Sequence, residues 1–198
     1  MCISGVIMSI RAFIAIEIEN PSVLSNLIRV RDMFTATGAD LKPVEDENIH
    51  LTIRFLGEVS SVTIEEIKRI LNDIPKHITK FEMRVFGVGA FPSISRPRVI
   101  WAGVVEGVEQ LAKIRQIVDA GIARAKLHDV HRDQHEFSPH ITLARVRSGR
   151  NIARVTDLLN QLKDYDFGVT PVTEVKLKQS ILTPRGPIYR DLYVVKLG

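Results

Sequence analysis

The amino-acid sequence predicts an α+β fold of two similar lobes related by a pseudo-twofold. Each lobe is expected to be an antiparallel sheet with helices on its outer face, and a functional cleft is expected between the lobes. Three observations predict this. Apolar residues alternate at strand spacing in some segments and recur at helical spacing in others. The order helix, loop, strand, helix occurs twice in the 198 residues, and the strand of each copy carries the pattern His-apolar-Thr-apolar, at 50–53 and 140–143.

The first repeat, at about 8–95, is expected to contain a strand at 12–18, a helix from Pro21 to Gly38, a strand at 49–55 and a helix from about residue 63. Asn20 and Pro21 suit an N-cap followed by proline at the first helical position. Gly57 predicts a turn after the second strand. Thr63 and Glu66 match a capping box.

The second repeat, at about 96–198, follows a strand at 81–88 and is expected to contain a strand at 98–105, helices at 107–127 and 151–163, and strands around His140, at 174–182 and at 188–197. A loop rich in proline and serine, 92–97, separates the first two of these strands. The whole chain is expected to form one bilobal domain. Met8 begins a cleaner strand pattern, so residues 1–7 are a candidate N-terminal extension.

Composition limits the classes of function. An apolar content of 45% supports a substantial core, and a net charge of +4 with a pI of about 9.3 suits an anionic partner such as RNA. The single cysteine, Cys2, excludes an internal disulfide framework and favours the reducing cytoplasm. Arg11 and Glu17 interrupt the apolar N-terminus, so we expect neither a signal peptide nor a membrane span.

The repeated pattern carries the chemistry. Residues two apart in a strand share a face, so His50 and Thr52 point together, as do His140 and Thr142. Two imidazoles across a cleft suit in-line displacement at phosphorus, because one can accept a proton while the other donates one. The threonine hydroxyls can donate hydrogen bonds to phosphate oxygens. This reaction requires no metal and no cofactor.

The extended strings His50-Leu-Thr-Ile-Arg-Phe-Leu-Gly57 and Ser138-Pro-His-Ile-Thr-Leu-Ala-Arg145 resemble those of the 2H phosphoesterase superfamily. Within it, the chain is most similar to the RNA 2′,3′-cyclic phosphodiesterases, also called 2′-5′ RNA ligases. The strand from Phe13, the segment 96–101 and the segment 180–189 support this resemblance, which covers nearly the whole chain from Met8.

The resemblance implies hydrolysis of 2′,3′-cyclic phosphate ends of RNA to a 2′-phosphate. It leaves open whether the natural substrate is a tRNA half, another RNA end or a small cyclic nucleotide. It implies His50 as general acid and His140 as general base, roles that the pseudosymmetry leaves interchangeable. An RNA 5′-hydroxyl in place of water would form a 2′-5′ linkage by the same displacement. We expect a cytoplasmic monomer that does not associate with membranes.

Three further residues are candidates for the site. Arg54 shares the predicted strand face of His50 and is either a phosphate ligand or a solvated arginine. Arg145 matches an arginine that the family places near the phosphate, but its offset of five from His140 requires a β-bulge or a strand end. Phe13 is either a stacking surface for a base or a core residue.

Two other hypotheses remain open. The chain could be a non-catalytic module that binds RNA ends. Histidine substitutions would then weaken binding or have no effect, and no cyclic phosphate would be consumed. It could also be a metallohydrolase that uses the loop residues His128, His131 and His135, although their spacing matches no common zinc pattern. A polar loop between helix and strand accounts for those histidines more simply.

Overall fold

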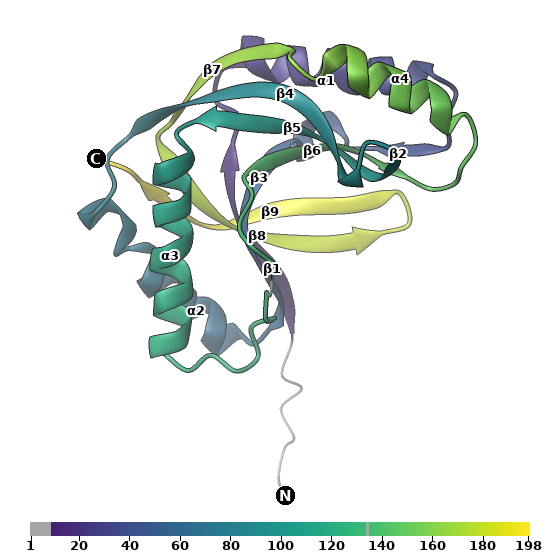
Figure 1. Ribbon diagram of the computed structural model, residues 1–198. Coiled ribbons are helices and arrows are strands. Elements are labelled where there is room, and N and C mark those ends of the chain that lie inside the picture. Colours follow the sequence, from purple (N-terminus) through teal and green to yellow (C-terminus); the bar gives the residue numbers. More distant parts are fainter. Residues whose placement is uncertain (1–8, 134) are drawn as a thin grey trace, which may run out of the picture.

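Nine strands form one curled antiparallel sheet in the computed structural model, which describes residues 9–133 and 135–198 (Figure 1). The strands lie in the order β7-β4-β5-β6-β3-β1-β8-β9, and the short β2 pairs with β6. The α+β class is confirmed. The candidate extension at 1–7, with Cys2, and the suggested start at Met8 lie outside the described residues.

The strands are β1 (Ile10–Glu17), β2 (Leu41–Pro43), β3 (His50–Val59), β4 (Phe81–Ser93), β5 (Arg96–Glu106), β6 (His140–Val146), β7 (Asp166–Val172), β8 (Glu174–Thr183) and β9 (Gly186–Lys196). The helices are α1 (Pro21–Ala36), α2 (Ser61–Leu71), α3 (Val108–Arg124) and α4 (Ile152–Leu162), with short 3₁₀ turns at Asp46–Asn48 and Ile74–Lys76.

The sheet has two halves that meet at β3 and β6. Strands β1, β8 and β9 extend one half, and β5, β4 and β7 extend the other, so β1 and β5 hold equivalent positions next to the centre. Helices α1 and α4 lie along the β5 half, whereas α2 and α3 pack together beside the β3 half (Figure 1). Each half is therefore covered by helices from both parts of the chain. The predicted repeat boundary near residue 95 stays a prediction.

The helix starts follow their capping residues. The Asn20 side chain accepts a hydrogen bond from the Ser22 backbone N–H, and Pro21 is the first residue of α1, as predicted. The predicted capping box at Thr63 is wrong. The N-cap of α2 is Ser60, which accepts a hydrogen bond from the Thr63 backbone N–H, while the Thr63 hydroxyl donates to Asp129.

Several strand limits differ from those predicted. Gly57 does not form a turn but lies within β3 at φ +82°, beside a shift in the pairing with β1. Pro92 and Pro97 belong to β4 and β5, which form a longer hairpin than expected. Strand β7 was not expected because Gly168 and Pro171 interrupt its pattern. It is an edge strand, where proline is tolerated.

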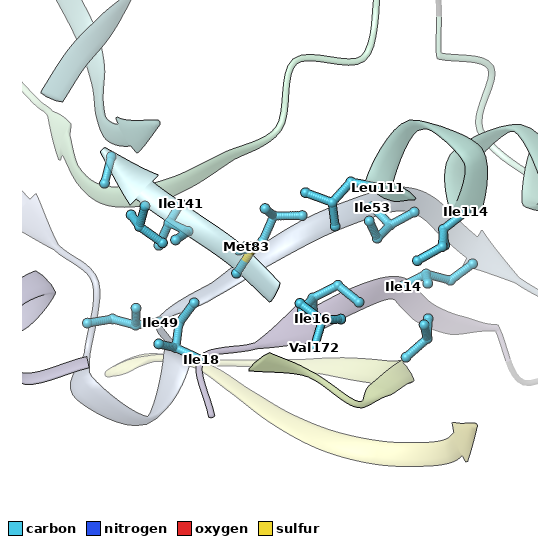
Figure 2. Close-up of a cluster of buried hydrophobic side chains, with 14 of the residues drawn as sticks. Ile14, Ile16, Ile18, Ile49, Ile53, Met83, Leu111, Ile114, Ile141 and Val172 are labelled. Atoms are coloured by element: carbon cyan, nitrogen blue, oxygen red, sulfur yellow. The ribbon is translucent and has the colours of Figure 1, made fainter. Parts of the chain in front are cut away.

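The core lies between the sheet and the helices. Figure 2 shows Ile14, Ile16 and Ile53 of the sheet beside Leu111 and Ile114 of α3, all nearly or completely buried. Burial of these side chains on the helix side leaves the other face of the sheet available for polar groups. No helix in the described residues is long and apolar enough to cross a bilayer.

Candidate active site

His50 and His140 are the first residues of the two central strands. The fully buried Leu51 and Ile141 are direct partners across β3 and β6. Because side chains alternate and the strands are antiparallel, His50 lies opposite Thr142, and Thr52 opposite His140, on the face away from the core. Diagonal partners in such a pair lie about 7–8 Å apart, so both imidazoles can reach one phosphate. The structure thus brings the four predicted residues together.

Both imidazoles are held in the same way by the backbone. The Nδ1 atom of His50 lies 2.7 Å from the Asn48 carbonyl oxygen, and Nδ1 of His140 lies 2.7 Å from the Ser138 carbonyl oxygen. A carbonyl oxygen only accepts, so Nδ1–H donates in each ring and Nε2 is left for chemistry. The Nε2 atom of His50 lies 3.0 Å from the Thr52 hydroxyl oxygen.

Aromatic rings surround each histidine. The ring centroids of Phe13 and Tyr189 lie 5.0 and 5.4 Å from that of His50. In the other half, Phe91 and Trp101 lie 5.0 and 6.3 Å from His140. Each set combines a ring from the neighbouring strand, β1 or β5, with a ring from a more distant strand, β9 or β4.

Phe13 fits the core role better than the stacking role. Its side chain is 2% exposed and packs against Tyr189 at 4.8 Å as well as against His50. A base could not lie flat on a ring that its neighbours already cover. In this cluster the exposed ring is Phe55, which is 54% exposed and 6.1 Å from Phe13.

A β-bulge follows each threonine. On β1, Ile14 and Ala15 are adjacent, but their partners on β3 are Arg54 and Thr52, so Ile53 is the extra residue. On β5, adjacent Ile100 and Trp101 pair with Ala144 and Thr142, which makes Leu143 the extra residue of β6. A bulge reverses the alternation of side chains. The fifth residue after each histidine therefore returns to the cleft face.

The bulge at Leu143 returns Arg145 to the cleft face, as its offset of five from His140 required. It is exposed, and its charge acts on both halves of the site. Burial lowers the pKa of His140, and Arg145 lowers it further. Burial raises the pKa of Tyr189, and Arg145 opposes that change ahead of Arg11 and Lys178. The Arg145 cation thus lies near enough to His140 and Tyr189 to lower the pKa of both groups.

The predicted position of Arg54 on the cleft face is wrong, because the bulge at Ile53 turns it toward α3. It is 6% exposed, and its Nε atom lies 2.9 Å from an Asp119 carboxylate oxygen. Its two remaining nitrogens donate to the carbonyl oxygens of Phe55 and His131, each at 2.7 Å. Arg54 ties β3 to the loop that precedes β6.

Burial also dominates the electrostatics of His50. It lowers the pKa of His50 to about 4, against the raising effect of the Asn48 carbonyl. Lys178 lowers this pKa further, and Glu17 raises it. The lowered pKa values of His50 and His140 leave both imidazoles neutral in the free protein at neutral pH. An anionic phosphate between them would favour protonation.

Comparison with known proteins assigns the family. The family model described as LigT like Phosphoesterase matches residues 16–101 and 103–189, so each segment contains one of the two histidines. The chain belongs to the LigT-like phosphoesterase family. The family resemblance indicated by the paired motifs is confirmed.

Two relatives of this LigT-like phosphoesterase match over nearly their whole length. A protein of Aeropyrum pernix named RNA 2′,3′-cyclic phosphodiesterase is 41% identical over 174 residues, which cover 88% of this chain and 96% of the relative. A protein of the same name from Methanothermobacter thermautotrophicus is 32% identical over 190 residues, covering 96% and 100%.

Two solved structures share the fold of this LigT-like phosphoesterase. One is a protein of Thermus thermophilus, with a TM-score of 0.78 and 26% identity over 94% of this chain and 97% of that one. The other is Escherichia coli LigT complexed with 3′-AMP, with a TM-score of 0.76 and 25% identity over 96% and 98%.

Sequence reasoning missed part of the site of this LigT-like phosphoesterase. Tyr189 was more simply explained as a packing residue of its strand. Strand alternation predicts Phe55 on the core face with Leu51 and Ile53, which is wrong: the ring is 54% exposed, because the bulge at Ile53 reverses the alternation. Phe91 was not considered. The signal for Phe55 was its offset of five from His50, which is that of Arg145 from His140. Patterns of residues carried no signal for Phe91, because its contact with the site depends on how β4 pairs with β5.

The polar residues of the loop before β6 serve the fold in the described part of the chain. Asp129 accepts hydrogen bonds at the start of α2, and Asp133 pairs with Arg115. His128, His131 and His135 are exposed. Within residues 9–133 and 135–198, no three His, Cys, Asp or Glu side chains are arranged to hold a metal ion.

Proposed function

We propose that this protein hydrolyses the 2′,3′-cyclic phosphate ends of RNA and leaves a 2′-phosphate. The observation that carries the proposal is the pair of histidines, each with a threonine, on the two central strands. Relatives of up to 41% identity, named RNA 2′,3′-cyclic phosphodiesterase, support the choice of substrate. The net charge of +4 suits an anionic polymer.

The proposed reaction is one in-line displacement. A water oxygen attacks phosphorus while Nε2 of His140 takes its proton, and the bond from phosphorus to O3′ breaks as Nε2 of His50 donates a proton to O3′. The hydroxyls of Thr52 and Thr142 donate to nonbridging phosphate oxygens, and Arg145 offsets their charge. The Nδ1 hydrogen bonds support these roles because they direct both Nε2 atoms away from the backbone.

The charge beside His140 supports its role as general base. Arg145 disfavours a protonated imidazole at His140, and a general base must begin neutral. At His50, Lys178 lowers the pKa more than Glu17 raises it, so these two side chains together do not favour a protonated His50. The bound phosphate anion would favour protonation of His50, which is the form that a general acid needs.

Ligation would use the same site. If the 5′-hydroxyl of a second RNA replaces water as the nucleophile, the same displacement joins the two ends by a 2′-5′ linkage. Cleaved tRNA halves are the natural RNA that we propose, and a monomeric enzyme in the cytoplasm remains our prediction.

The test uses a short RNA with a 2′,3′-cyclic phosphate, incubated with the protein and excess chelator. We expect complete conversion to the 2′-phosphate. Conversion to the 3′-phosphate would contradict the role of His50 as donor to O3′. Loss of activity on chelation would favour a metallohydrolase, and tight binding without conversion would indicate a non-catalytic RNA-end-binding module.

A further inference from the structure

Two buried arginines hold equivalent places in the two halves. Arg31 lies on α1 and Arg115 on α3, the helices that follow β1 and β5, and their side chains are 9% and 10% exposed. Both make the same three kinds of contact: an aspartate of the same helix, an aspartate of the segment before a histidine strand, and a backbone carbonyl. This shared pattern sets them apart from the exposed ion pairs of the protein.

For Arg31 the partners are the carboxylates of Asp32 (2.7 Å) and Asp46 (2.5 Å) and the carbonyl oxygen of Val44 (2.7 Å). For Arg115 they are the carboxylates of Asp119 (2.5 Å) and Asp133 (3.2 Å) and the carbonyl oxygen of Ile53 (3.1 Å). Each guanidinium is thus shared between two carboxylates, which offset the cost of burying its charge.

The two anchored segments are those that orient the histidines. Asp46 begins the 3₁₀ turn that ends at Asn48, whose carbonyl accepts from Nδ1 of His50. Arg31 therefore holds the segment two residues before the carbonyl that fixes the imidazole. The Val44 backbone N–H also donates to the Leu143 carbonyl at 2.9 Å, at the bulge of the opposite strand.

The second segment is held in the same manner. Arg115 binds Asp133, and its guanidinium carbon lies 5.6 Å from the ring centroid of Phe137. Phe137 immediately precedes Ser138, whose carbonyl accepts from Nδ1 of His140. Arg115 thus contacts the segment next to the carbonyl that fixes this second imidazole, and it also binds the bulge residue Ile53.

We propose that Arg31 and Arg115 are positioning residues, each of which holds one histidine, His50 or His140, with Nδ1 protonated and Nε2 toward the phosphate. The planar guanidinium reaches three acceptors in fixed directions, which a lysine ammonium cannot reproduce. The expected loss of activity rests on the proposed function, whereas the expected change in the imidazole tautomers does not.

Heteronuclear NMR of the imidazole nitrogens tests this without substrate. In Arg31→Lys we expect His50 to lose its Nδ1–H tautomer in part, while the His140 signals stay as in the wild type. In Arg115→Lys we expect the reverse. Arg69→Lys is the matched control, because Arg69 makes an exposed ion pair with Glu66 on α2 and should leave both rings unchanged.

Kinetics supplies a second readout. In each variant kcat should fall by roughly 10- to 100-fold while KM stays within about twofold, because a misplaced imidazole slows the reaction without removing a phosphate ligand. If a lysine variant fails to fold, Asp46→Asn and Asp133→Asn replace it, since each leaves the arginine one carboxylate on its own helix.

A folded variant with both imidazoles unchanged, or with both changed equally, would overturn the proposal. A selective change of tautomer in a protein that does not consume cyclic phosphate would leave the positioning role intact and refute the proposed function. The two ideas therefore fail by different observations.

Discussion

Phe55 and Arg145 occupy equivalent positions in the two halves of the sheet, five residues after His50 and His140, and both follow a β-bulge. One position carries an exposed aromatic ring and the other an exposed cation. The two walls of the site are therefore chemically different although their strands are alike. Of these two positions, the one beside His140 carries the charge, so we expect that wall to bind the phosphate.

Replacing Arg145 tests this difference. Arg145→Ala should lower kcat/KM for a cyclic phosphate by about 10- to 100-fold, since a hydrogen bond to a charged group contributes roughly 1.5–3 kcal/mol. Arg145→Lys should retain part of the activity, because it keeps the charge and loses the bidentate geometry. Steady-state kinetics measure both. Full activity in Arg145→Ala would remove the residue from the site.

Arg54 should behave in the opposite way. Arg54→Met breaks the ion pair between the buried Arg54 and the partly exposed Asp119 and removes two hydrogen bonds to carbonyl oxygens, so the free energy of unfolding should fall by roughly 2–4 kcal/mol. In the folded fraction kcat/KM should fall less than in Arg145→Ala, because Arg54 contacts the loop before β6 and not the cleft face. Denaturant titration and kinetics on the same preparation check this. Unchanged stability with lost activity would make Arg54 a phosphate ligand after all.

The maximum of kcat/KM should lie at acid pH. The free protein must hold one neutral and one protonated histidine, so kcat/KM should follow a bell centred on the mean of their two pKa values. Burial lowers the pKa of His50 to about 4 and lowers that of His140 from its ordinary 6.5, which sets the centre below pH 6.5. A maximum at or above pH 7.5 would refute these environments.

Burial of His50 also predicts a loss of stability in acid. The folded pKa is about 4 and the ordinary value is 6.5, so the unfolded chain binds more protons in this window. The contribution of neutral His50 to the free energy of unfolding is complete above pH 6.5. It is lost as the pH falls to about 4, which lowers the free energy of unfolding by roughly 1–3 kcal/mol. In His50→Asn the fall in the free energy of unfolding between these values should be smaller by that amount. His128→Asn, at an exposed histidine, should match the wild type.

Sequence patterns predicted the regular parts of the fold and failed where the chain departs from them. Alternation located β3, and Asn20 with Pro21 located the start of α1. The offset of Arg145 required a β-bulge or a strand end, but the residue pattern located neither bulge, because Ile53 and Leu143 are apolar and would suit a regular strand equally well. The bulge at Leu143 returns Arg145 to the cleft face, and the bulge at Ile53 turns Arg54 away from it.

The remaining part of the site depends on contacts between distant elements. Tyr189 reaches His50 only because β9 follows β8 beside β1. Arg31 and Arg115 look like ordinary helix residues in the sequence, and their partners lie in segments whose path no periodicity predicts. The shared orientation of His50 and His140 was predictable because a strand sets the direction of its side chains locally, whereas the contacts of Arg31 and Arg115 are set by packing.

The central claim is that His50 and His140 act as one acid–base pair on a cyclic phosphate. The most direct measurement is the rate of cleavage of a 2′,3′-cyclic phosphate RNA by the wild type, His50→Ala, His140→Ala and the double variant, with folding verified for each. We predict that either single substitution lowers kcat by at least about 10²- to 10⁴-fold and that the double variant is little worse, because the two groups act in one step. Wild-type turnover in either single variant would contradict the claim.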